Sequence, residues 1–326
     1  MDPLDYGDRG HGAGVMSVAV CLLAYSMIVA VLSPALLVRS TRAGRRPRLS
    51  LVAWVSAIGS VLVSWAAAVV FVVIDVVRDL LAEQHLDLGR CFTQLHDAAA
   101  GAYGSVVRLG LAALVVLALT AAAVVLWRLT RMLLRARSVT HRHAQQARMV
   151  GRRHHRHDAV VLDHPEPAAY SVAGNPHAIV LTQGIVTVLD DVQLAAVMAH
   201  ERAHLSGHHH FLLAVTRALA RVFPRLDLFV TGAAQVARLV EMVADDAAAR
   251  VHGPLVVREA LLTLADSQGA GHLGSIEVGL VDRVRRLSPS AATGGLVSSM
   301  AMVAVVLGPL AATFAAMGGL GLCILG

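Results

Sequence analysis

The sequence predicts an α+β domain inserted among four transmembrane helices, and two observations lead to this fold class. The chain of 326 residues is 56% hydrophobic and 15% charged, with a mean hydropathy of +0.64. Such a composition is typical of a membrane protein and excludes a disordered chain. One segment, 138–290, has the size of a globular domain, and its short apolar runs precede amphipathic stretches with helical spacing.

Four apolar stretches are long enough to cross a bilayer, which takes about 20 residues of helix. They lie at about 15–38, 49–74 and 105–127, with the fourth inside 293–325. We therefore expect a membrane region with three transmembrane helices over 1–137, a domain over 138–290 and a fourth transmembrane helix over 291–326.

The distribution of Arg predicts the orientation, because positive residues accumulate on the cytoplasmic side of a membrane. The loop after the first span holds five Arg and no acid, and nine Arg lie within 128–156, whereas 75–108 holds five acids and three Arg. We expect a multi-pass protein of the cytoplasmic (inner) membrane, with both termini outside and the domain in the cytoplasm. Contact with the bilayer explains the Arg run, so direct nucleic-acid binding is not expected.

Within the domain, the sheet is expected first and the helices after it. Residues 138–158 should continue the third span as a helix. Short strands are expected at 159–162, 170–173 and 178–182, with 185–189 as a further candidate. Asp190 or Asp191 should then cap a helix. Two more amphipathic helices are expected at about 229–251 and 255–266.

The helix that follows Asp191 carries His200-Glu201-Arg202-Ala203-His204, an HExxH motif. Residues four apart lie on one helix face, so both imidazoles can bind one metal ion. Zinc with three protein ligands keeps a fourth position for water and lowers the pKa of that water to about 7. Glu201 is placed to contact this water, so it can act as general base. The motif therefore predicts a catalytic zinc ion.

Glu241, on the next long helix and 37 residues after His204, is the expected third ligand. Asp245 lies one turn later and can accept a hydrogen bond from the ring N–H of a ligand histidine. Two acids in an apolar stretch are costly unless a cation is near. The alternative is an ordinary acidic pair with Arg238 as its partner.

Together these motifs resemble the integral-membrane zinc metallopeptidases of the gluzincin type, with Glu241-Met242-Val243-Ala244-Asp245 as the Glu-x-x-x-Asp motif. Four spans with the zinc domain between the third and fourth look like the BlaR/MecR type of sensor-transducer peptidase. This resemblance implies an α+β zinc metallopeptidase domain. It implies one Zn²⁺ held by His200, His204 and Glu241, with Glu201 as the catalytic base.

The resemblance also implies the substrate: a cytosolic protein, which in the best-studied members is a winged-helix transcriptional repressor cleaved in a signalling pathway. The sequence departs from that type in one respect, because no chain follows the fourth span to form an extracellular penicillin-binding sensor domain. That departure puts β-lactam sensing in doubt.

Two other functions stay open. The HtpX and prenyl-protein-processing group shares the Glu-x-x-x-Asp arrangement, which implies membrane-protein quality control. The second open function is that of a non-catalytic transmembrane signal transducer with a structural zinc site. The intact Glu201 counts against it, because a closed structural site has no need of a general base. Homo-oligomer formation is left open.

A peptidase also needs a place for the peptide and a donor for the oxyanion. Substrates of such enzymes add as a strand along a sheet edge. Residues 178–182 are the candidate edge, an ordinary core strand being the alternative. The candidate oxyanion donors are polar side chains around the motif: Tyr170, His208, His209, His210, Arg250 and His252. The run His208–His210 could also bind a second metal ion, although a polar helix surface is the favoured interpretation.

Overall fold

The computed structural model describes residues 11–42, 44–81, 104–154, 159–174, 177–267 and 273–288. The fourth expected span and most of the loop after the second span lie outside these residues. The chain divides into two compact units. One comprises Met1–Ser33, Ser56–Arg128 and Val305–Gly326, and the other comprises Pro34–Val55 and Leu129–Ala304.

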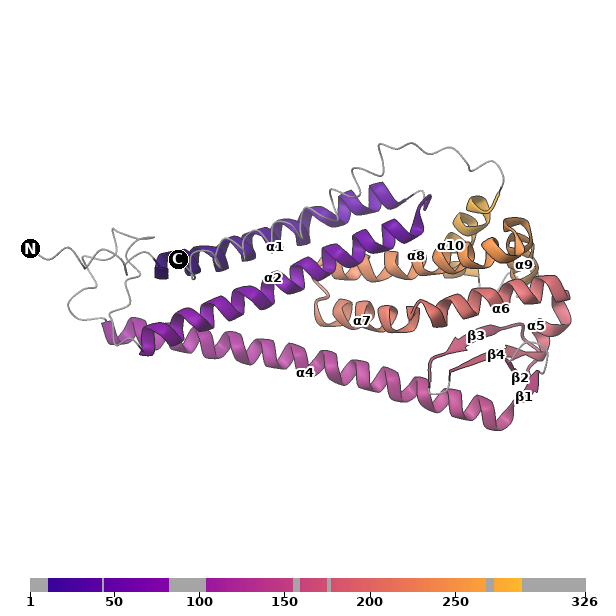
Figure 1. Ribbon diagram of the computed structural model, residues 1–326, viewed down its shortest axis with the longest axis horizontal. Coiled ribbons are helices and arrows are strands. Elements are labelled where there is room, and N and C mark those ends of the chain that lie inside the picture. The colour runs from indigo at the N-terminus through magenta and orange to yellow at the C-terminus, as the bar shows by residue number, and fades with distance from the viewer. Residues whose placement is uncertain are drawn as a thin grey trace, which may run out of the picture. The chain divides into compact units, whose positions relative to one another are not determined.

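Three long helices correspond to the first three expected spans (Figure 1). They are α1 (His11–Thr41), α2 (Pro47–Leu81) and α4 (Gly104–Val150). Segments long and apolar enough to cross a membrane lie within them at Ala19–Thr41, Pro47–Ile74 and Ala112–Thr140. The described residues therefore support membrane localisation and three of the four expected spans. The orientation stays a prediction.

Small residues let α1 and α2 approach each other in the first unit. Ala19 and Leu22 of α1 pack against Ala68 of α2, and all three are buried. The indole N–H of Trp65 donates a hydrogen bond to the hydroxyl of Ser26, with 3.0 Å between nitrogen and oxygen. Close packing of small side chains and hydrogen bonds between helices are the usual contacts of transmembrane helices.

A four-stranded mixed sheet opens the second unit's domain. Its strands are β1 (Arg152–His154), β2 (Ala159–Leu162), β3 (Ala169–Val172) and β4 (Ala178–Thr182), in the order β1-β2-β4-β3. The β2–β4 pair is parallel, and the β1–β2 and β3–β4 pairs are antiparallel. The three expected strands are thus confirmed.

Two sequence expectations about this sheet are wrong. The helix expected over 138–158 ends at Val150, because Arg152–His154 pairs with β2 and satisfies its backbone groups in the sheet instead. Ala178–Thr182 is not an edge strand: β4 lies between β2 and β3, and all five of its residues are buried. The edges are β1 and β3.

The candidate strand at 185–189 forms a short helix instead, α5 (Gln183–Val188). Thr182 caps its start, since the Thr182 hydroxyl accepts a hydrogen bond from the backbone N–H of Ile185. A Cβ on Gly184 would collide with the carbonyl oxygen of Pro165, so glycine is needed for this close approach. The periodicity of a short apolar run cannot distinguish a strand from a helix. Here the cap at Thr182 favours the helix.

Among the described residues, five helices follow: α6 (Asp191–Ser206), α7 (His209–Val222), α8 (Asp227–His252), α9 (Pro254–Ser267) and α10 (Leu273–Arg286). Three of them, α6, α8 and α9, agree with the expected helices. Neither α7 nor α10 was expected from the sequence pattern. At α7 the reason is physical, because His208 precedes it without a side-chain hydrogen bond to the first turn, so the usual start signal is missing.

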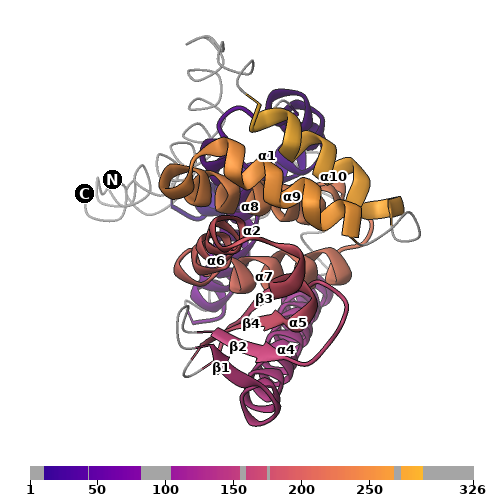
Figure 2. The ribbon, with the colours of Figure 1, turned by 90° about the vertical axis from the view of Figure 1, so that its right-hand side faces the viewer.

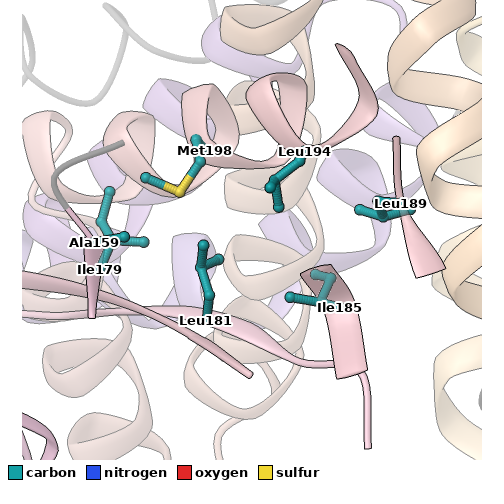
Figure 3. Packing of buried hydrophobic residues seen from close by; sticks show 7 residues of the cluster. All are labelled: Ala159, Ile179, Leu181, Ile185, Leu189, Leu194 and Met198. Atoms are coloured by element: carbon teal, nitrogen blue, oxygen red, sulfur yellow. The ribbon is translucent and has the colours of Figure 1, made fainter. Parts of the chain in front are cut away.

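The core fixes α6 on the sheet. Leu194 and Met198, one turn apart on α6, pack against Ile179 and Leu181 of β4 (Figure 3). On its other side α6 contacts α8 and α9, so it lies between the sheet and the layer that contains those helices (Figure 2). The residues of α6 that turn away from the sheet therefore face α8.

We expect Asp190→Ala to destabilise α6 by about 1 kcal/mol. The Asp190 carboxylate accepts hydrogen bonds from the backbone N–H groups of Val192 and Gln193, and the Gln193 side chain accepts one from the backbone of Asp190. Hydrogen exchange on the full chain in detergent should be faster across 191–206. Asp190→Asn, which keeps an acceptor, is the control, and equal exchange in Asp190→Ala and the parent would show that the cap contributes nothing.

Candidate metal centre

Two histidines of α6 and one glutamate of α8 meet in the second unit. One ligand atom from each of His200, His204 and Glu241 lies within 4.8 Å of the others. The two Nε2 atoms are 3.0 Å apart, and they lie 3.4 Å and 3.6 Å from the Glu241 carboxylate oxygens. A tetrahedral zinc ion with bonds of about 2.0–2.1 Å needs its ligand atoms roughly 3.3 Å apart. The three side chains therefore fit one zinc ion.

Glu201 lies beside this cluster on the boundary between two faces of α6. Glu201 lies three positions after Met198, which packs on the sheet, so the Glu201 side chain also points toward the sheet. There Ser171 of β3 donates hydrogen bonds to the Glu201 carboxylate from its hydroxyl and from its backbone N–H. Burial raises the pKa of Glu201, while the nearby His200 and the Ser171 hydrogen bonds oppose the shift. A carboxylate with a raised pKa beside a metal cluster is suited to accept and return a proton.

Asp245 contacts the first histidine of the motif. Its Oδ1 lies 3.1 Å from Nδ1 of His200, and its side chain is fully buried. The hydrogen bond leaves Nε2 of His200 to face His204 and Glu241. A carboxylate on the far nitrogen of a ligand histidine fixes the ring's tautomer and orientation.

The cation that neutralises these acids is Arg283 of α10, not Arg238. The Arg283 guanidinium donates two hydrogen bonds of 2.7 Å to Asp245, and it lies 3.5 Å from Glu241. Arg238 instead donates to the carbonyl oxygen of Thr41 and to Asp282. The sequence showed that the acids needed a cation, but Arg283 sits among basic residues that also explain membrane topology.

Burial and neighbouring charges shift the pKa values of the three candidate ligands. Burial alone would lower the pKa of His200, but hydrogen bonds with Asp245 and Glu241 outweigh it and raise the pKa to about 9. Burial lowers the pKa of His204 to about 4. Burial would raise the pKa of Glu241, yet His200 and Arg283 hold it at about 2. Without metal, one proton is thus stored on His200.

A cavity of about 270 Å³ opens beside the cluster. His200, Glu201, Glu241 and Arg283 contribute its polar lining. The apolar lining comes from α5, α6 and α9: Ile185, Ala196, Val197, Val257, Ala260, Leu261 and Leu264. Pro167, Ala168 and Ala169, at the start of the edge strand β3, complete its wall. The cavity can therefore receive an apolar side chain next to the three candidate metal ligands.

None of the six candidate oxyanion donors lines this cavity within the described residues. Tyr170, His208 and His210 are exposed. His209 is buried, but it contacts His204 from the side away from the cluster, with 3.1 Å between the two Nδ1 atoms. His208–His210 do not form a second group of three metal-binding side chains in the part of the chain that the structure describes.

Zinc binding near neutral pH should release about one proton per ion, because a ligand imidazole must be neutral and the raised pKa of His200 keeps it protonated without metal. Zinc affinity should accordingly weaken as the pH falls below about 9. Calorimetry in buffers of different ionisation enthalpy measures the release. A zinc affinity that stays constant between the pKa of His200 and neutral pH would contradict this.

Comparisons with known proteins agree with the geometry. The chain is 37% identical to the "Protease HtpX homolog" of Acidiphilium cryptum (strain JF-5) over 62 residues. These 62 residues make up 18% of this chain and 22% of that protein. The chain thus matches about a fifth of that relative's length, and no solved structure matches. Neither finding singles out the BlaR/MecR type. Residues 133–266, which include His200, Glu201, His204 and Glu241, match Peptidase family M48, a family of zinc metallopeptidases.

Proposed function

We propose that this protein is a membrane zinc endopeptidase that cleaves proteins at the cytoplasmic membrane surface. The observation that carries the proposal is the cluster of three ligand atoms with Glu201 beside it, on a cavity that can admit a side chain. The Arg distribution supports a cytoplasmic domain. The match to Peptidase family M48 supports the chemistry.

His200, His204 and Glu241 would hold the ion, and Asp245 and Arg283 keep His200 in the binding orientation. Zinc, when bound, supplies Lewis-acid activation of water and of the scissile carbonyl. Glu201 accepts the proton of the attacking water and delivers it to the leaving amine. Its raised pKa suits this double role, because the protonated form is then accessible during the cycle.

The substrate peptide would lie along β3 rather than β4. Both sides of β4 are occupied by β2 and β3, so β4 has no free edge. The edge strand β3 contacts α6, and its Ser171 bonds Glu201. A peptide added to β3 would therefore pass the general base with its backbone extended.

The HtpX similarity favours membrane proteins as substrates, in a quality-control role, over the repressor of a signalling pathway. The quality-control role and the signalling role predict that different protein fragments are lost when cleavage stops. Proteomics of cells carrying the parent or Glu201→Gln should show fragments of membrane proteins in the parent only. Loss of a single fragment from a soluble DNA-binding protein would support the signalling role instead.

Glu201→Gln should keep about one zinc ion per chain and slow cleavage by about 100-fold or more, because it removes the base without removing a ligand. Zinc content by atomic absorption and cleavage of a generic protein substrate measure the two effects. Glu259→Gln, an exposed glutamate of α9, is the matched control. Full cleavage by Glu201→Gln would refute Glu201 as the general base, whereas a cellular response that survives this change would favour a signal transducer with a structural zinc site.

Glu241→Gln should lose most of the zinc, because it removes the one anionic ligand of the cluster. Asp245→Asn should lose less, since Asp245 acts through His200. Atomic absorption after dialysis measures both. Equal zinc content in Glu241→Gln and the parent would refute the ligand assignment.

A further inference from the structure

The second histidine of the motif has a partner of its own. Nε2 of His204 faces the cluster, 3.0 Å from Nε2 of His200. Nδ1 of His204 faces Nδ1 of His209 at 3.1 Å. The two rings meet almost at right angles, at 86°, with centroids 5.0 Å apart. This is the geometry of a hydrogen bond between the edges of two imidazoles.

The turn between α6 and α7 is built around the His209 side chain. Gly207 ends α6, and a Cβ there would collide with Nε2 of His209. His208 then adopts a left-handed conformation with φ of 50°, which is uncommon for a residue with a side chain. The result is that His209 is 4% exposed, whereas His208 and His210 on either side are exposed.

Two facing ring nitrogens attract each other only if one of them carries a hydrogen. A neutral His204 that offers Nε2 to a metal carries its hydrogen on Nδ1. That N–H points at His209, so Nδ1 of His209 must be the acceptor and its hydrogen must lie on Nε2. The contact therefore selects the tautomer of His204 that can bind metal.

We propose that His209 is a positioning residue for the metal centre, which accepts the Nδ1–H hydrogen bond of His204 and so directs Nε2 of His204 to the zinc ion. The inference rests on the proposed zinc site. His209 is no ligand itself, because its Nδ1 faces His204 and not the cluster. His200 has the equivalent support from Asp245, which is anionic, whereas His209 supports His204 without bringing a carboxylate into the site.

The test compares two replacements of similar length, His209→Gln and His209→Met, in the purified full chain in detergent. Glutamine keeps an acceptor and methionine does not. We expect His209→Met to weaken zinc binding about 10- to 100-fold in a chelator competition, the usual effect of removing such a partner. His209→Gln should recover most of the affinity. His210→Met, at the exposed neighbour, should match the parent.

Co²⁺ bound in place of zinc gives a second readout, because its visible absorption reports the arrangement of the ligands. The spectrum should change in His209→Met and return toward that of the parent in His209→Gln. Equal zinc affinity in His209→Met and the parent would overturn the inference, and so would equal losses in the Met and Gln variants, which would show a packing role. If the parent itself binds no zinc, the proposed function fails first, so the two failures are distinguishable.

Discussion

The site depends on the interaction of the buried Asp245 carboxylate with Arg283 and His200. A fully buried anion is stable only when opposite charge and hydrogen bonds replace its hydration. Arg283 supplies two hydrogen bonds and His200 the third contact. These three residues come from α8, α10 and α6, so one carboxylate ties together the three helices that surround the cluster. Removing Arg283 would leave the buried Asp245 carboxylate with His200 as its remaining partner.

A second set of contacts links α8 and α10 to the last turn of α1. Arg238 lies one turn before Glu241 on α8 and donates a hydrogen bond of 2.9 Å to the carbonyl oxygen of Thr41, in the last turn of α1. It also pairs with Asp282, the neighbour of Arg283 on α10. Helix C-terminal carbonyls favour such a cation. Arg238 therefore links α8 and α10 to the end of α1.

The sheet contributes an edge to the site rather than a ligand. Its central strand β4 is buried along its whole length, and α6 packs on it through Leu194 and Met198. That packing directs Glu201 toward β3 and turns the two histidines toward α8. A small sheet thus sets the rotation of α6 about its axis, and this rotation decides which side of the motif meets Glu241.

Sequence alone determined what depends on local periodicity. Hydropathy placed the three described helices that are long and apolar enough to cross a membrane, and the four-residue spacing of His200 and His204 placed both rings on one helix face. Two acids in an apolar stretch made Glu241 a candidate ligand, and Asp245 lies one turn later on the same helix.

Only the tertiary structure decided the partners of these residues. Arg283 meets Asp245 from 38 positions away, and no local pattern distinguishes it from the neighbouring basic residues. The sequence does not distinguish His209 from the two histidines beside it, whereas in the structure the turn at Gly207 leaves His209 buried. The central place of β4 follows from pairing with β3 and with the parallel strand β2, whose last residue, Leu162, precedes Ala178 of β4 by 16 positions. Periodicity fixes which face a residue occupies, whereas the neighbour across that face is fixed by how distant segments pack.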